Sequence, residues 1–305
     1  MKPILPITII GGYIGAGKTT LINHLLRHNN GLRLAVLVNE FGALPIDADL
    51  IENTDGNLIS IAGGCICCSF GDSLGTALMD VDRLDPRPEH ILIEASGVAI
   101  PGSIAATVDL YQNMQTSGVV VLADCETILT HAASEYIGDT ITRQLCDAGL
   151  IVLTKSDLIC DRTLNNVENW MHQSAKGASI VKTVQGQVPA DVVLGPNHIS
   201  TNTAPQHRAD ALFESQAYSA EIPLDAHSLA VALASEHFGL IRAKGCVVDT
   251  NGQSHAIQVV GRRWNVSDAP NNMKPGLVCI GLRGRFPSQK LTDLMNGVLS
   301  PIRLT

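Results

Sequence analysis

A glycine-rich stretch near the start of the chain constrains the fold more than any other feature. Residues 12–19 read Gly-Tyr-Ile-Gly-Ala-Gly-Lys-Thr and match the pattern G-x-x-x-x-G-K-[ST]. A β-branched run at 7–10 precedes it, and residues 19–28 follow with apolar side chains at helical spacing. Between a strand and a helix this pattern is typical of a phosphate-binding loop, with an ordinary glycine turn as the alternative interpretation.

The loop also predicts which atoms contact phosphate. Glycines let successive backbone N–H groups turn toward phosphate oxygens, and the start of the following helix adds a partial positive charge. Lys18 is expected to reach the β- and γ-phosphates as part of the catalytic machinery, and the Thr19 hydroxyl to bind Mg²⁺. The residues predicted to hold the phosphates are Gly12, Gly15, Ala16, Gly17, Lys18, Thr19 and Thr20.

A second acidic group is expected near the bound Mg²⁺, at the end of a neighbouring strand. Glu94 ends the apolar run 90–93, and Ala95-Ser96-Gly97 follows. We therefore expect Glu94 to help hold Mg²⁺ and the Gly97 N–H to contact the γ-phosphate and register its loss after hydrolysis. A solvated carboxylate at a strand end is the simpler alternative for Glu94.

A base-recognition element is predicted at residues 154–157, Thr-Lys-Ser-Asp, after the apolar run 150–153. It resembles the N/T-K-x-D element that reads guanine in GTPases. Asp157 would accept hydrogen bonds from guanine N1–H and the 2-amino group, with the Lys155 stem over the base. Adenine offers neither donor there, so GTP is favoured over ATP. Thr154 stands where Asn is usual, which predicts the loss of an amide tie to the phosphate loop.

Apolar runs set the expected fold class. Non-alternating strands at 34–38, 90–93, 119–122 and 150–153 predict an α/β fold, a P-loop NTPase with a mostly parallel, doubly wound sheet over residues 1–205. Residues 186–223 are rich in Pro, Asn, Ser and Thr and are expected to be irregular. Residues 206–305 predict a small C-terminal α+β domain with helices at 228–237 and 288–299 and a hairpin turn at Asn251-Gly252.

Three of the eight cysteines lie together in Gly-Gly-Cys-Ile-Cys-Cys, at Cys65, Cys67 and Cys68. Three thiolates within four residues suit a soft transition metal, and zinc would need a fourth ligand from Glu40, a histidine or water. A redox pair is the alternative. The five scattered cysteines are interpreted as small core residues, and Asp124 at a strand end as a helix N-cap or a nucleotide contact.

These motifs together closely resemble the CobW-like metal-handling GTPases (the cobalamin synthesis protein family of metallochaperone P-loop GTPases), which are relatives of the nickel-insertion GTPases. The motifs that carry the resemblance are 12–19, Asn39-Glu40-Phe41-Gly42, Gly64 to Cys68, Glu94 to Gly97 with Pro101, and 154–157. Segments at 240–245 and 258–264 are similar to that family's C-terminal domain. In the family's first switch region, the resemblance gives Asp47 a role in holding Mg²⁺ or orienting water.

The resemblance implies a GTPase that converts GTP to GDP and phosphate with Mg²⁺. It further implies a metallochaperone in which Cys65, Cys67, Cys68 and Glu40 bind Zn²⁺ or Co²⁺ and pass it to a client metalloprotein of unknown identity. A GTP-gated metal sensor or zinc buffer without delivery is the alternative, followed by an ATP-dependent P-loop kinase. An iron–sulfur ATPase is more distant.

The composition of the chain limits the classes of partner that it is expected to bind. The 21 basic and 29 acidic residues give a net charge of −8, and no basic run provides a surface for nucleic acid. No apolar run approaches the ~20 residues of a membrane span, so no membrane partner is expected. The first residues lack a secretory signal, so we expect a cytoplasmic protein with reduced cysteines. Homo-oligomerisation is left open.

Overall fold

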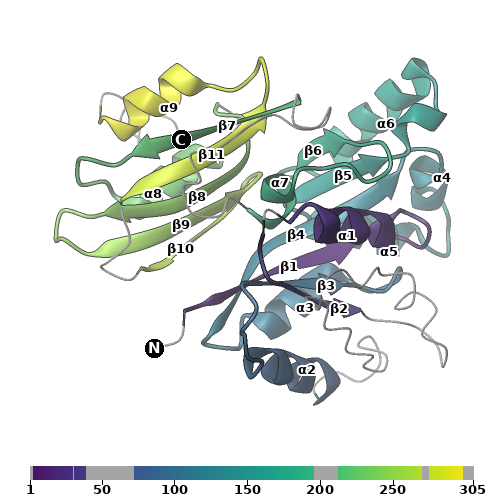
Figure 1. Cartoon of the computed structure of the whole chain (residues 1–305). Helices are drawn as coiled ribbons and strands as arrows, with labels where there is room; N and C mark the ends of the chain where they lie inside the picture. Colours follow the sequence, from purple (N-terminus) through teal and green to yellow (C-terminus); the bar gives the residue numbers. More distant parts are fainter. Residues whose placement is uncertain are drawn as a thin grey trace. The chain divides into compact units, whose positions relative to one another are not determined.

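The computed structural model describes residues 3–29, 31–38, 72–195, 212–235, 237–269 and 275–297. The chain divides into two compact units (Figure 1). The first holds the residues up to Lys176 together with Ile180–Leu194, and the second holds Gly177–Ser179 and the chain from Gly195 onward. The predicted domain boundary between residues 205 and 206 lies outside the described residues.

A six-stranded sheet in the order β2-β3-β1-β4-β5-β6 forms the centre of the first unit. Its strands are β1 (Leu5–Gly11), β2 (Leu34–Val38), β3 (His90–Glu94), β4 (Met114–Asp124), β5 (Leu150–Thr154) and β6 (Ser179–Lys182). The pairs β2/β3, β3/β1, β1/β4 and β4/β5 are parallel. Every residue of β2, β3 and β5 is buried, as a parallel sheet covered on both faces requires. The predicted α/β fold with a mostly parallel sheet is confirmed.

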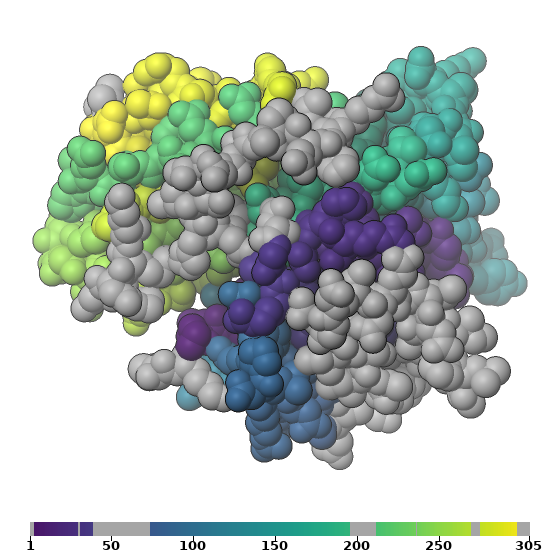
Figure 2. All heavy atoms as spheres, viewed as in Figure 1, coloured from purple at the N-terminus to yellow at the C-terminus, as the bar shows by residue number. Residues whose placement is uncertain are grey.

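The helices of this unit connect the strands. They are α1 (Lys18–Arg27), α2 (Asp72–Asp82), α3 (Pro101–Val108), α4 (Ile128–Ala132), α5 (Gly138–Asp147), α6 (Asp161–Ser174) and α7 (Ala190–Leu194), with a short 3₁₀ helix η2 (Ser156–Leu158). Helix α1 buries Leu21, Ile22 and Leu25, whereas Thr20 and Arg27 are exposed. Atoms of this N-terminal part of the chain, purple in Figure 2, lie on the face that is shown. Helix α3 packs against β1 and β4, and α5 and α7 pack against β4.

The direction of the strands determines where a site forms. Because β1, β3, β4 and β5 run parallel, their carboxyl ends meet at one edge of the sheet. Register places Glu94 beside Ile10 and Asp124 beside Thr154 at that edge. The phosphate loop, the acidic strand end and the base-recognition element therefore converge.

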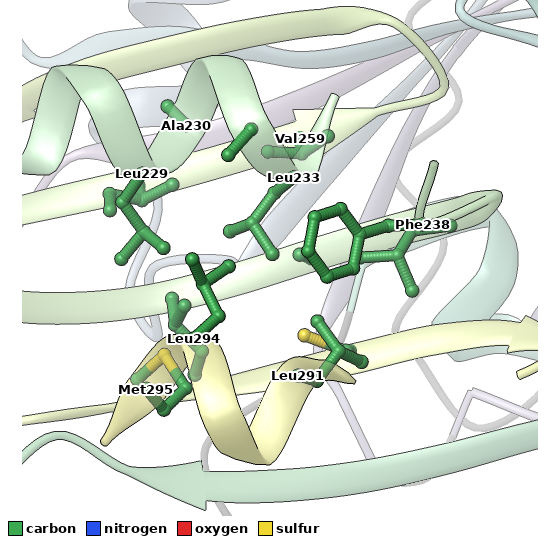
Figure 3. Packing of buried hydrophobic residues seen from close by; sticks show 14 of the residues in the cluster. Leu229, Ala230, Leu233, Phe238, Val259, Leu291, Leu294 and Met295 are labelled. Carbon is green, nitrogen blue, oxygen red and sulfur yellow. The ribbon is translucent and has the colours of Figure 1, made fainter. Parts of the chain in front are cut away.

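The second unit is an antiparallel sheet in the order β10-β9-β8-β11-β7, accompanied by helices α8 and α9. Its elements are β7 (Phe213–Ser219), α8 (Ala226–Leu233), β8 (Leu240–Val248), β9 (Ser254–Val260), β10 (Arg263–Asp268), β11 (Gly276–Leu282) and α9 (Ser288–Met295). Leu229 and Leu233 of α8 share one apolar cluster with Leu291 and Leu294 of α9 and with Phe238 (Figure 3). The predicted C-terminal combination of helices and strands is present.

Three expectations on secondary structure are wrong in part. The helix expected over 228–237 is α8, which begins at Ala226 and already ends at Leu233. Residues 186–223 contain α7 and β7, although they were expected to be irregular. Strand β7 lies at the edge of its sheet, where Glu214 to Gln216 need little burial, so it carries a weak apolar signal. The helix expected over 288–299 ends at Met295 because Gly297 has a φ of 71°, which stops a helix. Within the described ranges, no helix is long and apolar enough to cross a membrane.

Candidate functional site

The phosphate loop leaves β1 in a conformation that requires glycine. Gly12, Gly15 and Gly17 have φ values of 128°, 79° and 93°, a region that side chains rarely adopt. A Cβ atom on Gly12 would lie 2.5 Å from the Leu122 carbonyl oxygen of β4. The loop is thus held close against the neighbouring strand, with its backbone shaped for an anion.

Lys18 begins α1 and folds back over this loop. Its side chain is buried, and Nζ donates hydrogen bonds to the carbonyl oxygens of Gly12 at 3.0 Å and Tyr13 at 3.4 Å. The ammonium group therefore lies within the curl of the loop, where it can bind phosphate oxygens. Thr20, the third residue of α1, is exposed.

Thr19, in the first turn of α1, contacts Glu94, the last residue of β3. The Thr19 hydroxyl donates to Glu94 Oε1 at 3.3 Å, and Glu94 is 5% exposed. A hydroxyl and a buried carboxylate at the end of a phosphate loop are the hard oxygen ligands that suit Mg²⁺. The donor set therefore fits the expected cofactor.

The segment after Glu94 lies directly against the phosphate loop. A Cβ atom on Gly97 would be 2.8 Å from the Ile14 backbone nitrogen and 2.4 Å from its Cγ1. Only glycine permits this approach. The Ser96 hydroxyl is buried and has no hydrogen-bond partner within the described residues, so it has capacity for a phosphate oxygen or water.

The base-recognition element is tied to the phosphate loop by a threonine. The Thr154 hydroxyl donates to the Ala16 carbonyl at 2.9 Å, and Thr154 is 4% exposed. The expectation that Thr in place of Asn removes this tie is therefore wrong, because a hydroxyl on β5 reaches the loop. Asp157 lies in η2 and is exposed, as a side chain that meets an incoming base should be.

The sequence leaves Asp124 open between a helix N-cap and a nucleotide contact, and the structure pairs it with Lys155. Lys155 Nζ forms an ion pair with Asp124 Oδ2 at 2.6 Å, and this hydrogen bond raises the pKa of Lys155. The N-cap of α4 is Thr127, so Asp124 is not a helix cap. Lys155 itself has a φ of 56°. Asp124 thus orients the lysine whose stem is expected to cover the base.

Gln144 is a contact that sequence reasoning missed. It is 1% exposed, and its Nε2 donates to the Gly97 carbonyl at 3.0 Å and the Ala99 carbonyl at 2.8 Å. A single glutamine on an otherwise amphipathic helix is expected at the surface, so only the packing of α5 reveals the contact.

Several predicted residues cannot be placed. Asp47, Glu40, Cys65, Cys67 and Cys68 all lie outside the described residues. In the part of the chain that the structure describes, no three His, Cys, Asp or Glu side chains gather as a metal site.

The interpretation of the five scattered cysteines as core residues is right for three and wrong for two. Cys125, Cys246 and Cys279 are buried, whereas Cys146 and Cys160 are exposed. Burial raises the pKa of Cys125 to about 11 and that of Cys279 to about 12. Cys160 precedes α6, where a hydrogen bond with Thr163 lowers its pKa.

Comparison with known proteins gives consistent similarities. The chain is 30% identical over 223 residues to the zinc chaperone CobW of Sinorhizobium sp, which covers 63% of this chain and 62% of that protein. It is 37% identical over 167 residues to the zinc chaperone YjiA of Escherichia coli, covering 52% of this chain and 51% of that protein.

A third relative is the zinc-regulated GTPase metalloprotein activator 1 of Schizosaccharomyces pombe. It is 32% identical over 194 residues, which cover 60% of this chain and 47% of that protein. The match thus spans about half to three fifths of the length of these relatives.

A family model spans most of the first unit. The model described as CobW/HypB/UreG, nucleotide-binding domain matches residues 6–182, which include the phosphate loop, Glu94 and the segment 154–157. The chain therefore belongs to the CobW/HypB/UreG family and carries that family's nucleotide-binding domain.

Proposed function

We propose that the chain hydrolyses GTP with Mg²⁺ and uses this cycle to deliver a transition metal to a client metalloprotein. The observation that carries the nucleotide part is the Thr154 hydroxyl bound to the Ala16 carbonyl. This bond sets the distance between the phosphate loop and the segment that ends in Asp157. A nucleotide whose base and phosphates must be held together fits that arrangement.

The choice of GTP over ATP depends on Asp157. A carboxylate accepts hydrogen bonds from guanine N1–H and its 2-amino group, and adenine would leave the carboxylate without these donors. Such a loss costs about 1–3 kcal/mol, which is about 5- to 150-fold in affinity. An ATP-dependent kinase is the alternative that this preference argues against.

Hydrolysis is supported by the groups around the terminal phosphate. Lys18 would neutralise the β- and γ-phosphates, and the Gly97 N–H is proposed to contact the γ-phosphate, which the closeness of Gly97 to Ile14 in the phosphate loop supports. Thr19 and Glu94 would hold Mg²⁺, which supplies charge neutralisation on the transferred phosphoryl group when bound. Asp47 is proposed to orient water or help hold Mg²⁺, as the resemblance implies.

The transition metal is cargo. We propose that Cys65, Cys67 and Cys68, with Glu40, bind Zn²⁺ or Co²⁺, because thiolates are soft ligands that select such metals. Two of the relatives are named zinc chaperones, which supports zinc. A GTP-gated sensor or zinc buffer uses the same ligands without passing the metal on.

The nucleotide proposal is tested with an altered base. GTP and ATP turnover are measured for the wild-type chain and for Asp157→Asn, together with xanthosine triphosphate, whose 2-oxo group suits an amide donor. We expect the wild type to prefer GTP and the variant to prefer the xanthine nucleotide. Equal turnover of ATP and GTP by the wild type would contradict GTP recognition.

Delivery is tested by metal transfer to a chromogenic chelator from the Zn²⁺-loaded chain. Faster transfer with Mg²⁺-GTP than with a non-hydrolysable GTP analogue supports a cycle driven by hydrolysis. Equal rates would support the sensor or buffer alternative instead.

A further inference from the structure

The segment that follows Glu94 is anchored by a helix distant in the sequence. At its start, the Ala95 N–H donates to the Ile10 carbonyl of β1 at 2.9 Å. The Ala99 N–H donates to the Ser96 carbonyl at 3.0 Å, which closes a turn. That turn projects Gly97 toward the phosphate loop, where the close approach to Ile14 leaves no room for a side chain.

Gln144 of α5 completes the anchoring. A primary amide has two N–H hydrogens, and two carbonyl oxygens of the turn, those of Gly97 and Ala99, lie 3.0 and 2.8 Å from Gln144 Nε2. Because Gln144 is 1% exposed, water cannot substitute for it.

One turn of α5 further on, Asp147 fixes the end of the same segment. Asp147 Oδ2 accepts a hydrogen bond from the Gly102 N–H at 2.7 Å. Gly102 lies in the first turn of α3, directly after Pro101, where backbone N–H groups lack partners within the helix. Helix α5 therefore holds both the turn that contains Gly97 and the start of α3.

We propose that Gln144 is a positioning residue for GTP hydrolysis, which keeps the Gly97 N–H in place for the γ-phosphate. The inference rests on the proposed function, because it assumes that Gly97 contacts the γ-phosphate. A glycine-containing turn loses much conformational freedom when it is ordered, so anchoring it before the nucleotide binds lowers that cost in the transition state.

The role predicts a selective effect. Both hydrogen bonds from Gln144 Nε2 go to the turn that follows β3. Asp157, which is expected to recognise the base, follows β5, and β3 and β5 lie on opposite sides of β1 in the sheet. Loss of the Gln144 hydrogen bonds should therefore weaken the response to the γ-phosphate and leave the binding of GDP, which lacks it, nearly unchanged.

The test compares Gln144→Met, which keeps the side-chain length and removes both donors, with Ile141→Val on the same helix. Ile141 is 2% exposed and one turn away, so its variant removes one buried methyl group from α5 and no hydrogen bond. Kinetic constants for GTP are measured, as are the affinities for GDP and for a non-hydrolysable GTP analogue.

For Gln144→Met we expect kcat to fall about tenfold or more and the preference for the GTP analogue over GDP to fall at least threefold, with GDP affinity within twofold. Ile141→Val should leave all of these near the wild type. Unchanged kcat and analogue preference in Gln144→Met, or parallel losses in both variants, would overturn the role.

A second variant covers the case in which Gln144→Met does not fold. Asp147→Ala removes a partly exposed acceptor at the other end of the segment and should lower kcat and the analogue preference in the same direction. Wild-type values of kcat and of the analogue preference in Asp147→Ala would then overturn the inference. If the wild type hydrolyses no GTP, the proposed function fails, while the analogue-to-GDP ratio still reports on Gln144 separately.

Discussion

Thr154→Val tests the tie between the two halves of the nucleotide site. Valine has nearly the same shape as threonine but no hydroxyl, so the substitution removes the hydrogen bonding of this hydroxyl and leaves no cavity. The hydroxyl donates to the Ala16 carbonyl at 2.9 Å, and the Ala123 carbonyl is a more distant acceptor at 3.4 Å. Loss of the bond to Ala16 should weaken nucleotide binding more than it lowers stability.

The expected loss of nucleotide affinity in Thr154→Val follows from the burial of this residue. Thr154 is 4% exposed, and a bound nucleotide would cover the loop further, so the Ala16 carbonyl would lack a donor in the complex. In the nucleotide-free chain the loop can relax and hydrate that carbonyl. The penalty of about 1–3 kcal/mol for an unsatisfied buried group therefore falls largely on the bound state. It corresponds to about 5- to 150-fold weaker binding of GTP, and similarly of GDP.

Fluorescent GTP and GDP titrations measure the effect, with thermal unfolding in parallel. Thr8→Val is the matched control, because Thr8 is also fully buried and its hydroxyl bonds His90 Nε2 at 2.9 Å within the same sheet. We expect Thr8→Val to lower the melting temperature and leave nucleotide affinity unchanged, and Thr154→Ser to behave as the wild type. Nucleotide affinity within twofold of the wild type in Thr154→Val would refute the reasoning.

Three further predictions address the phosphate loop, the Mg²⁺ ligands and the exposed thiols. Gly12→Ala should destabilise the first unit by about 1–3 kcal/mol, visible as a lower melting temperature, because its Cβ would meet the Leu122 carbonyl oxygen at 2.5 Å; an unchanged melting temperature would contradict the loop geometry. Glu94→Gln should raise the Mg²⁺ concentration needed for half-maximal GTP hydrolysis by about 10- to 100-fold, and an unaltered Mg²⁺ dependence would remove this residue from the metal site. The pKa of Cys160 is lowered by its hydrogen bond with Thr163, so more thiolate is present below pH 9 and alkylation should be faster than in Thr163→Val; equal rates between pH 7 and 9 would exclude that hydrogen bond as the cause.

The centre of the fold could be predicted because its strands are continuous apolar runs. Leu34–Val38 and Leu150–Thr154 are buried at every position, and such sequences have few alternatives to a parallel sheet. The edge strands β7 and β10 could not be predicted in the same way. Arg263–Asp268 is exposed or half-buried along its length, so its pairing with β9 comes from neighbours and not from its own composition.

Some residues of the candidate site could likewise be predicted from the sequence, and others could not. Lys18, Thr19 and Glu94 could be predicted because each belongs to a motif with fixed spacing. The partnership of Asp124 with Lys155 depends on β4 lying beside β5, and strand order is not encoded in local sequence. Comparison with the usual asparagine predicts that Thr154 lacks a tie to the phosphate loop. The position of Thr154 at the end of β5 nevertheless lets its hydroxyl reach the Ala16 carbonyl.

Metal affinity in defined nucleotide states tests the central claim most directly. Zn²⁺ and Co²⁺ binding is measured by competition with a chelator, in Mg²⁺-GTP, in Mg²⁺-GDP and without nucleotide. The wild-type chain is compared with a Cys65/Cys67/Cys68→Ser variant. We predict tighter binding with GTP in the wild type and loss of this binding in the variant. Equal affinity in all three nucleotide states would contradict a GTP-driven cycle of metal delivery.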